Sequence, residues 1–132
     1  NAALEDEAWQ EAEEHFRRAL ATPSGDSPPA RQQATRADLL LGLARAVVAL
    51  ERDGEALGLI REAFQTGVDS GCSLGRKVAA HAALLEGSAP TLAVDERRRR
   101  YEAAVRLGRL SGLAQGRAIA KEAEARLADP VG

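Results

Sequence analysis

The chain has few of the residues that covalent chemistry uses, because its 132 residues include one cysteine, two histidines and no methionine. With Cys72 alone no intrachain disulfide can form, which is compatible with a reducing compartment. Aromatic residues make up only 3% of the sequence, whereas strands favour aromatic and β-branched side chains. This shortage disfavours a β-sandwich.

Long apolar runs are also missing. The most apolar stretch, residues 39–50, is interrupted by Arg45 and is shorter than the roughly 20 residues that a membrane span needs. The first residues carry acids and lack the apolar segment of a secretory signal. We therefore expect a cytoplasmic chain without a membrane partner. Since it holds no methionine, we expect it to be a single domain from a longer protein.

Charge of either sign is not in large excess, since the formal net charge is −2. The distribution is uneven: residues 1–16 carry six acids and no lysine or arginine, whereas residues 95–117 carry seven arginines against three acids. The overall balance disfavours nucleic acid as a partner. The opposite charges of the two ends leave self-association open.

Alanine is abundant, with 28 residues, and it has the highest intrinsic helix propensity. Small and large apolar residues recur at positions i, i+4, i+7 and i+8, which lie on one face of a helix. The recurring sets are Ala12, Phe16, Ala19 and Leu20, then Ala56, Ile60, Ala63 and Phe64, and more faintly Ala103, Leu107 and Leu110. The pattern predicts an all-α fold of antiparallel helical hairpins whose alanines allow close approach.

Prolines and glycines divide this pattern into about six helices. The predicted helices cover residues 3–21, 27–52, 55–66, 74–86, 94–109 and 111–128. We expect Pro23 and Pro130 to stop the first and last helices, and residues 67–75 to form a glycine-rich loop. Ser27, Asp53 and Ser73 are the expected caps of the helices that follow them.

The run from Trp9 to Leu20, closed by Pro23, resembles the second helix of a tetratricopeptide repeat, which has an aromatic, alanine, a large aromatic, Ala-Leu and proline at these intervals. Residues 55–64 are similar, and residues 43–47 resemble the first helix of the same unit. The anchor alanines of the three sets are 44 and 47 residues apart, longer than the usual repeat of about 34. The chain therefore resembles the longer, irregular tetratricopeptide-like arrays of bacterial regulators. This resemblance implies a short right-handed superhelix.

No set of catalytic or metal-binding residues converges in the sequence. A cysteine nucleophile needs a nearby base, and only His15 and His81 could supply it. We interpret Cys72 as a partly buried small residue, His81 as a core or groove histidine, and His15 as a surface residue. Two histidines and one cysteine without close spacing disfavour a metal site. We expect neither an enzyme nor a cofactor.

The run Arg97–Arg100 begins the fifth predicted helix, where positive charge opposes the helix dipole. Consecutive side chains point around a helix, so these arginines do not form one phosphate-binding stripe. We expect a solvated helix start in which Glu96 and Glu102 pair with the arginines. Contact with an acidic partner or with nucleic acid is the alternative.

The resemblance implies a concave face lined by the first helix of each pair. The candidate partner-contacting residues on that face are Arg36, Arg45, Arg76, Lys77 and His81. Such a basic groove would suit a protein or peptide partner, an acidic one in particular. The leading hypothesis is a non-enzymatic scaffold in a bacterial regulatory or signalling protein. A small-molecule-sensing regulatory domain is the alternative, which a deep apolar pocket enclosed by the second to fifth helices would favour.

Overall fold

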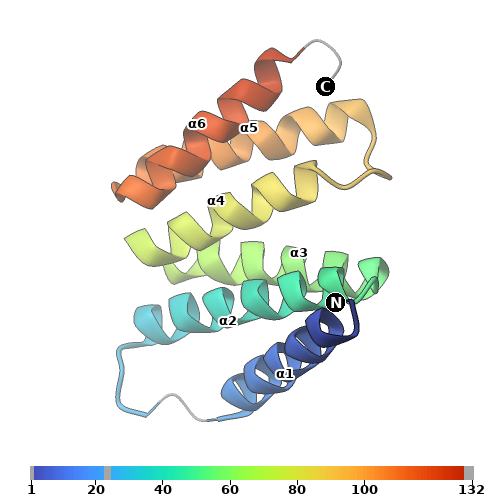
Figure 1. Ribbon diagram of the computed structural model, residues 1–132. Helices are drawn as coiled ribbons and strands as arrows, with labels where there is room; N and C mark the ends of the chain where they lie inside the picture. Colours follow the sequence, from blue (N-terminus) through green and yellow to red (C-terminus); the bar gives the residue numbers. More distant parts are fainter. Residues whose placement is uncertain (1, 23–24, 130–132) are drawn as a thin grey trace.

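The computed structural model describes residues 2–22 and 25–129, which form six helices and, within these ranges, no strand (Figure 1). The helices are α1 (Ala2–Ala21), α2 (Pro29–Ala49), α3 (Asp53–Ser70), α4 (Ser73–Gly87), α5 (Val94–Leu110) and α6 (Ala114–Ala128). The expected all-α fold with about six helices is confirmed. Pro23 and Pro130, the expected helix stops, lie outside the described residues.

The helices are stacked in chain order, from α1 at the bottom of Figure 1 to α6 at the top. Each helix contacts the next, and α2 and α6 also contact α4. The even-numbered helices therefore form a continuous layer, as expected for stacked hairpins. Within the described residues, no helix is long and apolar enough to cross a membrane.

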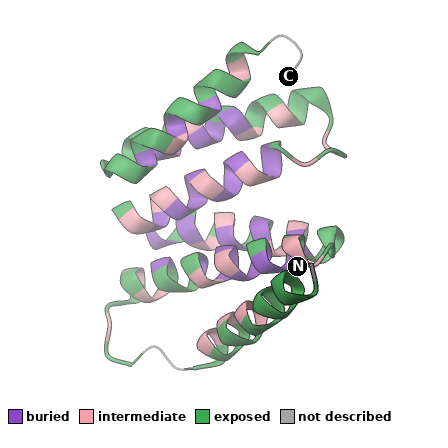
Figure 2. Cartoon of the chain, viewed as in Figure 1, coloured by how far each residue is buried: buried purple, intermediate pink, exposed green. Residues whose placement is uncertain are grey.

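The core depends on alanine, as the sequence pattern predicts. Ala37, Ala44 and Ala63 are fully buried between α2, α3 and α4. The anchor residues Ala56 and Ala103 are also buried, whereas Ala12 of α1 is half-buried. Figure 2 shows the same contrast, with burial concentrated in the middle of the stack and α1 mostly exposed.

Two glycines make room for aromatic side chains. A Cβ atom on Gly42 of α2 would lie 2.5 Å from the ring of Phe16 of α1. A Cβ atom on Gly87 of α4 would lie 2.7 Å from the ring of Tyr101 of α5. In both places a ring of an odd-numbered helix fills the space above a glycine of an even-numbered one.

The glycine-rich loop expected at residues 67–75 is wrong, because α3 continues to Ser70 and α4 begins at Ser73. Gly67 and Gly75 are helical and face each other, since a Cβ atom on Gly67 would lie 2.5 Å from the carbonyl oxygen of Gly75. These glycines permit close helix packing and do not break the helices. Only Gly71, with φ of 68°, adopts the left-handed conformation that glycine favours at a helix end.

The same corner occurs twice. Ser70 Oγ donates to the carbonyl of Gly67 at 2.7 Å and accepts from the Cys72 N–H at 3.3 Å. Ser111 Oγ donates to Gly108 at 2.7 Å and accepts from the Leu113 N–H at 3.2 Å. The matching residues of the two corners, which are 41 positions apart, are Gly67 and Gly108, Ser70 and Ser111, Gly71 and Gly112, and Gly75 and Gly116. The α3–α4 and α5–α6 turns thus share one local design.

The expected caps are also wrong. Asp53 and Ser73 are the first residues of their helices, and the N-cap positions belong to Pro28, Arg52 and Cys72, none with a side-chain cap hydrogen bond. Asp53 instead places its charge in the first turn of α3, where the helix dipole favours an acid.

The second helix ends at Ala49 and not at Arg52, because Glu51 adopts a left-handed φ of 63° that ends the helical path.

Candidate functional site

The even-numbered helices α2 and α6 both pack against α4, and charged side chains on all three helices act electrostatically on His81. Burial lowers the pKa of His81, and the positive charges of Arg45 and Lys77 lower it further, whereas Glu122 and Asp38 act in the opposite direction. These groups come from α2, α4 and α6. We call Asp38, Arg45, Lys77, His81 and Glu122 the even-helix face. The structure thus brings together three of the five residues expected there.

This face carries both signs of charge. Its acids, Asp38 and Glu122, were not predicted to lie on this face. Asp38 lies seven residues before Arg45, a spacing of about two helical turns, so the periodicity of α2 alone could have revealed it. Lys77 Nζ donates to Gln115 Oε1 of α6 at 3.2 Å, which connects neighbouring helices across the face.

Arg36 and Arg76 do not belong to the even-helix face. Arg36 is nine residues before Arg45, about half a turn away on α2, and its guanidinium lies 3.3 Å from Glu62 Oε1 of α3. Arg76 is five residues before His81, about 140° around α4. Their positions follow from the helical period, which the sequence interpretation did not apply to them.

The polar neighbours of the Cys72 thiol are a hydroxyl group and a backbone carbonyl group rather than a base. Its Sγ lies 3.4 Å from Ser70 Oγ and 3.9 Å from the carbonyl oxygen of Ala30. The contact with the Ser70 hydroxyl lowers the pKa of this thiol, burial opposes that effect, and backbone N–H groups at the start of α4 lower the pKa again. Cys72 is half-buried. His15 is exposed and packs edge-on against the ring of Phe16.

Within the Arg97–Arg100 run, Arg97 and Arg100 are half-buried, whereas Arg98 and Arg99 are exposed. Arg97 donates to the carbonyls of Ala89 and Leu92 at 3.2 and 3.3 Å. Arg100 lies 3.5 Å from Glu86 Oε1, so the expected pairing with Glu96 or Glu102 is wrong for this residue. Because Arg97 and Arg100 face the α4–α5 connection and α4, they hold the start of α5 in place.

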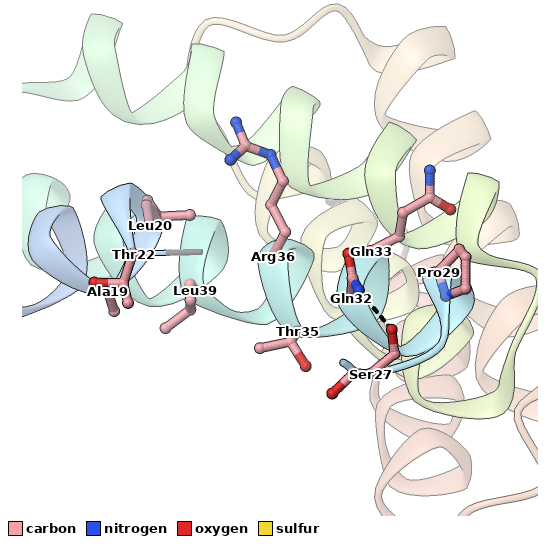
Figure 3. Close-up of a pocket in the computed structure, with 10 residues that line it drawn as sticks. All are labelled: Ala19, Leu20, Thr22, Ser27, Pro29, Gln32, Gln33, Thr35, Arg36 and Leu39. Atoms are coloured by element: carbon pink, nitrogen blue, oxygen red, sulfur yellow. Dashed lines mark hydrogen bonds between the residues drawn. The ribbon is translucent and has the colours of Figure 1, made fainter. Parts of the chain in front are cut away.

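One hollow on the described part of the chain, of about 620 Å³, lies between the end of α1 and the start of α2. In Figure 3, Gln33 and Arg36 extend from one side of α2 and Thr35 and Leu39 from the other, while Gln32 donates to the carbonyl of Ser27. The polar groups of this hollow therefore do not converge on one ligand position.

A second hollow, of about 600 Å³, has Arg45 in common with the even-helix face and is mostly apolar. Its lining comes from α1 to α4 and the α4–α5 connection, and its larger side chains are Trp9, Arg45, Val48, Leu57, Ile60 and Leu85. We call it the Trp9 cavity. An apolar pocket was expected only under the alternative hypothesis of a sensing domain, and of these lining residues only Arg45 was a predicted contact residue.

None of the family models matches the chain, and neither does any curated protein or solved structure.

Proposed function

We propose that this chain is a non-enzymatic binding module that holds a segment of a protein or peptide on its even-helix face. The observation that supports this function most directly is that α2 and α6 both pack against α4, so that these three helices present charged side chains on one layer, where they act on His81. Stacked helical arrays present such continuous surfaces, since each new helix extends the face of the one before it.

The charges of this face specify the kind of segment. Arg45 and Lys77 contribute positive charge, and Asp38 and Glu122 contribute negative charge, within electrostatic range of the half-buried His81. A segment carrying both acidic and basic residues complements this arrangement better than a purely acidic one does. Complementary charges at such a surface set register and partner choice more than affinity.

A peptide library displayed on phage, selected against the whole chain, tests this proposal. We expect the selected peptides to shift the amide NMR signals of Arg45, Lys77, His81 and Glu122. Lys77→Glu should weaken binding about tenfold, the effect of losing a charged contact of about 1.4 kcal/mol. Arg106→Glu, an exposed position on α5, is the matched control and should leave affinity unchanged. Shifts confined to α1 or α5 would contradict the proposal.

The Trp9 cavity favours a second candidate, a small-molecule-sensing regulatory domain. It is lined by side chains of α1, α2, α3 and α4, close to the set of helices that the sequence analysis named for this alternative. A volume of about 600 Å³ lies within the range of small-molecule sites. The two candidates share Arg45, whereas Lys77 belongs only to the face and Gly54 only to the cavity, so variants at these two positions test each candidate separately.

A further inference from the structure

Large apolar side chains gather at the Trp9 cavity without being covered. Trp9 is 39% exposed and Val48 is 47% exposed, and both line the cavity together with the half-buried Leu57 and Leu85. Exposed apolar surface concentrated in one concave place is typical of ligand sites. The cavity is therefore suited to the apolar part of a ligand.

Two charged residues, Arg45 and Asp53, line the described part of this cavity. Asp53 lies in the first turn of α3, where the helix dipole stabilises a carboxylate. Arg45 is exposed and lies just before the last turn of α2. That last turn contains no basic residue. Among the described residues it forms neither an ion pair nor a hydrogen bond. Its guanidinium is thus available to a carboxylate, which it can bind through two parallel hydrogen bonds.

We propose that the Trp9 cavity binds a small amphipathic carboxylate, with its apolar body against Trp9, Val48 and Leu85 and its carboxylate on Arg45. A neutral hydrocarbon would fill the same space but would leave the guanidinium unpaired. An inorganic anion would reach Arg45 but would leave the apolar surface exposed to water. This inference goes beyond peptide binding on the even-helix face, because the cavity extends under α1 and onto the α4–α5 connection.

The tryptophan at position 9 provides the readout, since it is the only tryptophan of the chain. Decanoate, decan-1-ol and decylammonium share one alkyl chain and differ in the charge of the head group. We expect decanoate to change the Trp9 emission saturably and to bind at least about tenfold more tightly than the other two, as one charge-assisted contact predicts. Equal affinity for all three probes would overturn the proposal.

Arg45→Gln tests the head-group contact. This variant should weaken decanoate binding about tenfold and leave decan-1-ol binding unchanged. Arg31→Gln is the matched control, because Arg31 is an exposed arginine of the same helix but lies about 21 Å further along it. Equal losses in the two variants, or no loss in Arg45→Gln, would show that Arg45 does not hold the carboxylate.

Gly54→Leu tests the cavity itself. Gly54 lines the cavity, and a Cβ atom there would meet no atom within 4 Å, so the larger side chain can enter without displacing the fold. It should abolish decanoate binding. Gly58→Leu, one turn further along α3 and equally unobstructed, should retain it. Calorimetry gives a readout independent of Trp9.

The C-terminus of a peptide also combines an apolar side chain with a carboxylate, so the experiment must separate a peptide from a small molecule. If a peptide ending in leucine with a free carboxylate binds at Arg45 and decanoate does not, the assignment to a small molecule is overturned. If Lys77→Glu loses peptide binding but binds decanoate as the wild-type chain does, the even-helix face and the Trp9 cavity are two separate sites. Failure of the peptide selection leaves the decanoate measurement unaffected.

Discussion

At the scale of single residues, Glu86 is the acid whose replacement we expect to be most costly. It is 2% exposed and lies 3.0 Å from Arg61 of α3 and 3.5 Å from Arg100 of α5. Glu86→Gln keeps the shape but leaves both guanidinium groups without their counter-charge. We expect a loss of about 1–3 kcal/mol in the free energy of unfolding, measured by urea denaturation.

Glu62→Gln is the matched control for this measurement. Glu62 pairs with Arg36 at 3.3 Å, and both side chains are half exposed. An exposed pair of this kind contributes no more than about 1 kcal/mol. Equal losses in the two variants would show that Glu86 is solvated and does not connect three helices.

His81 predicts how stability responds to acid. Burial, together with the charges of Arg45 and Lys77, lowers its pKa in the folded chain, so the unfolded chain binds the proton more readily. Its contribution to stability is therefore complete above the unfolded pKa of about 6.5 and decreases as the pH falls below that value. The slope from one proton is at most about 1.4 kcal/mol per pH unit.

The measurement is urea denaturation at pH 7.5 and pH 5.5 for the wild-type chain and His81→Gln. The variant should lose less free energy of unfolding on acidification, because it has no proton to bind at this position. Asp38 and Glu122 also face His81 and raise its pKa, so Glu122→Gln should steepen the dependence. An identical pH response of wild type and His81→Gln would contradict the assignment.

At the scale of elements, the repeated corner makes Gly75 the more informative glycine to replace. A Cβ atom there would lie 1.8 Å from Ser70 Oγ and 2.6 Å from the carbonyl oxygen of Gly67. Because one of these neighbours is backbone, α3 and α4 must separate. We expect Gly75→Ala to cost about 1–3 kcal/mol despite the higher helix propensity of alanine, as measured by thermal unfolding.

Gly58→Ala in α3 is the control with the opposite expected sign. A Cβ atom at Gly58 meets no atom within 4 Å, so only the propensity difference of up to about 1 kcal/mol acts, in the stabilising direction. Gly116→Ala should behave like Gly75→Ala, since its Cβ atom would lie 2.0 Å from Ser111 Oγ. If Gly75→Ala and Gly116→Ala both raise the temperature of thermal unfolding, the helices do not pack closely at these corners.

These corners also show what could be predicted from the sequence. Alanine periodicity identified the helices, because burial repeats along the chain with the helical turn. It could not distinguish a glycine that ends a helix, such as Gly71, from one that allows contact, such as Gly67, since that depends on the neighbouring helix. The 41-residue recurrence of Gly67, Ser70 and Gly75 was the available signal, and the alanine spacing of 44 and 47 residues obscured it.

The candidate site was predictable only in part for the same reason. Lys77 and His81 are one turn apart on α4, so periodicity placed them together. That Arg36 pairs with α3, whereas Arg45 remains unpaired beside a cavity, depends on how α1 and α3 pack against α2. The Trp9 cavity is formed by four helices and one connection, and no single segment encodes it.

At the scale of the whole molecule, the two ends of the stack differ in character. The positions of α6 that correspond to the buried Ala80 and Ala83 of α4, counted by the 41-residue recurrence, are Lys121 and Glu124. Both are exposed, so α6 presents a polar outer side. At the other end, α1 exposes Leu4 and Trp9. Self-association through α1 or α6 stays a prediction.

The same asymmetry predicts an order of local unfolding. Among the described helices, α1 packs mainly against α2 and is joined to α3 by the Arg17–Glu55 ion pair, whereas α4 contacts α2, α3, α5 and α6. Residues 3–11 of α1 are exposed throughout. Because local opening costs least where few buried contacts are lost, amides of this segment should exchange with solvent far faster than those of α4, whose exchange should approach the global unfolding limit.

Hydrogen exchange with and without decanoate connects this order to the Trp9 cavity. A ligand that binds only the closed form stabilises it by RT ln(1 + [L]/Kd), about 2.7 kcal/mol at one hundred times Kd. Since Trp9 belongs to α1 and lines the cavity, decanoate should slow exchange in the first half of α1 by up to about one hundredfold. The Gly54→Leu variant should show no such protection. Equal exchange rates in α1 and α4 of the free chain would contradict the proposed order, because the end of the stack would then be as firmly held as its centre.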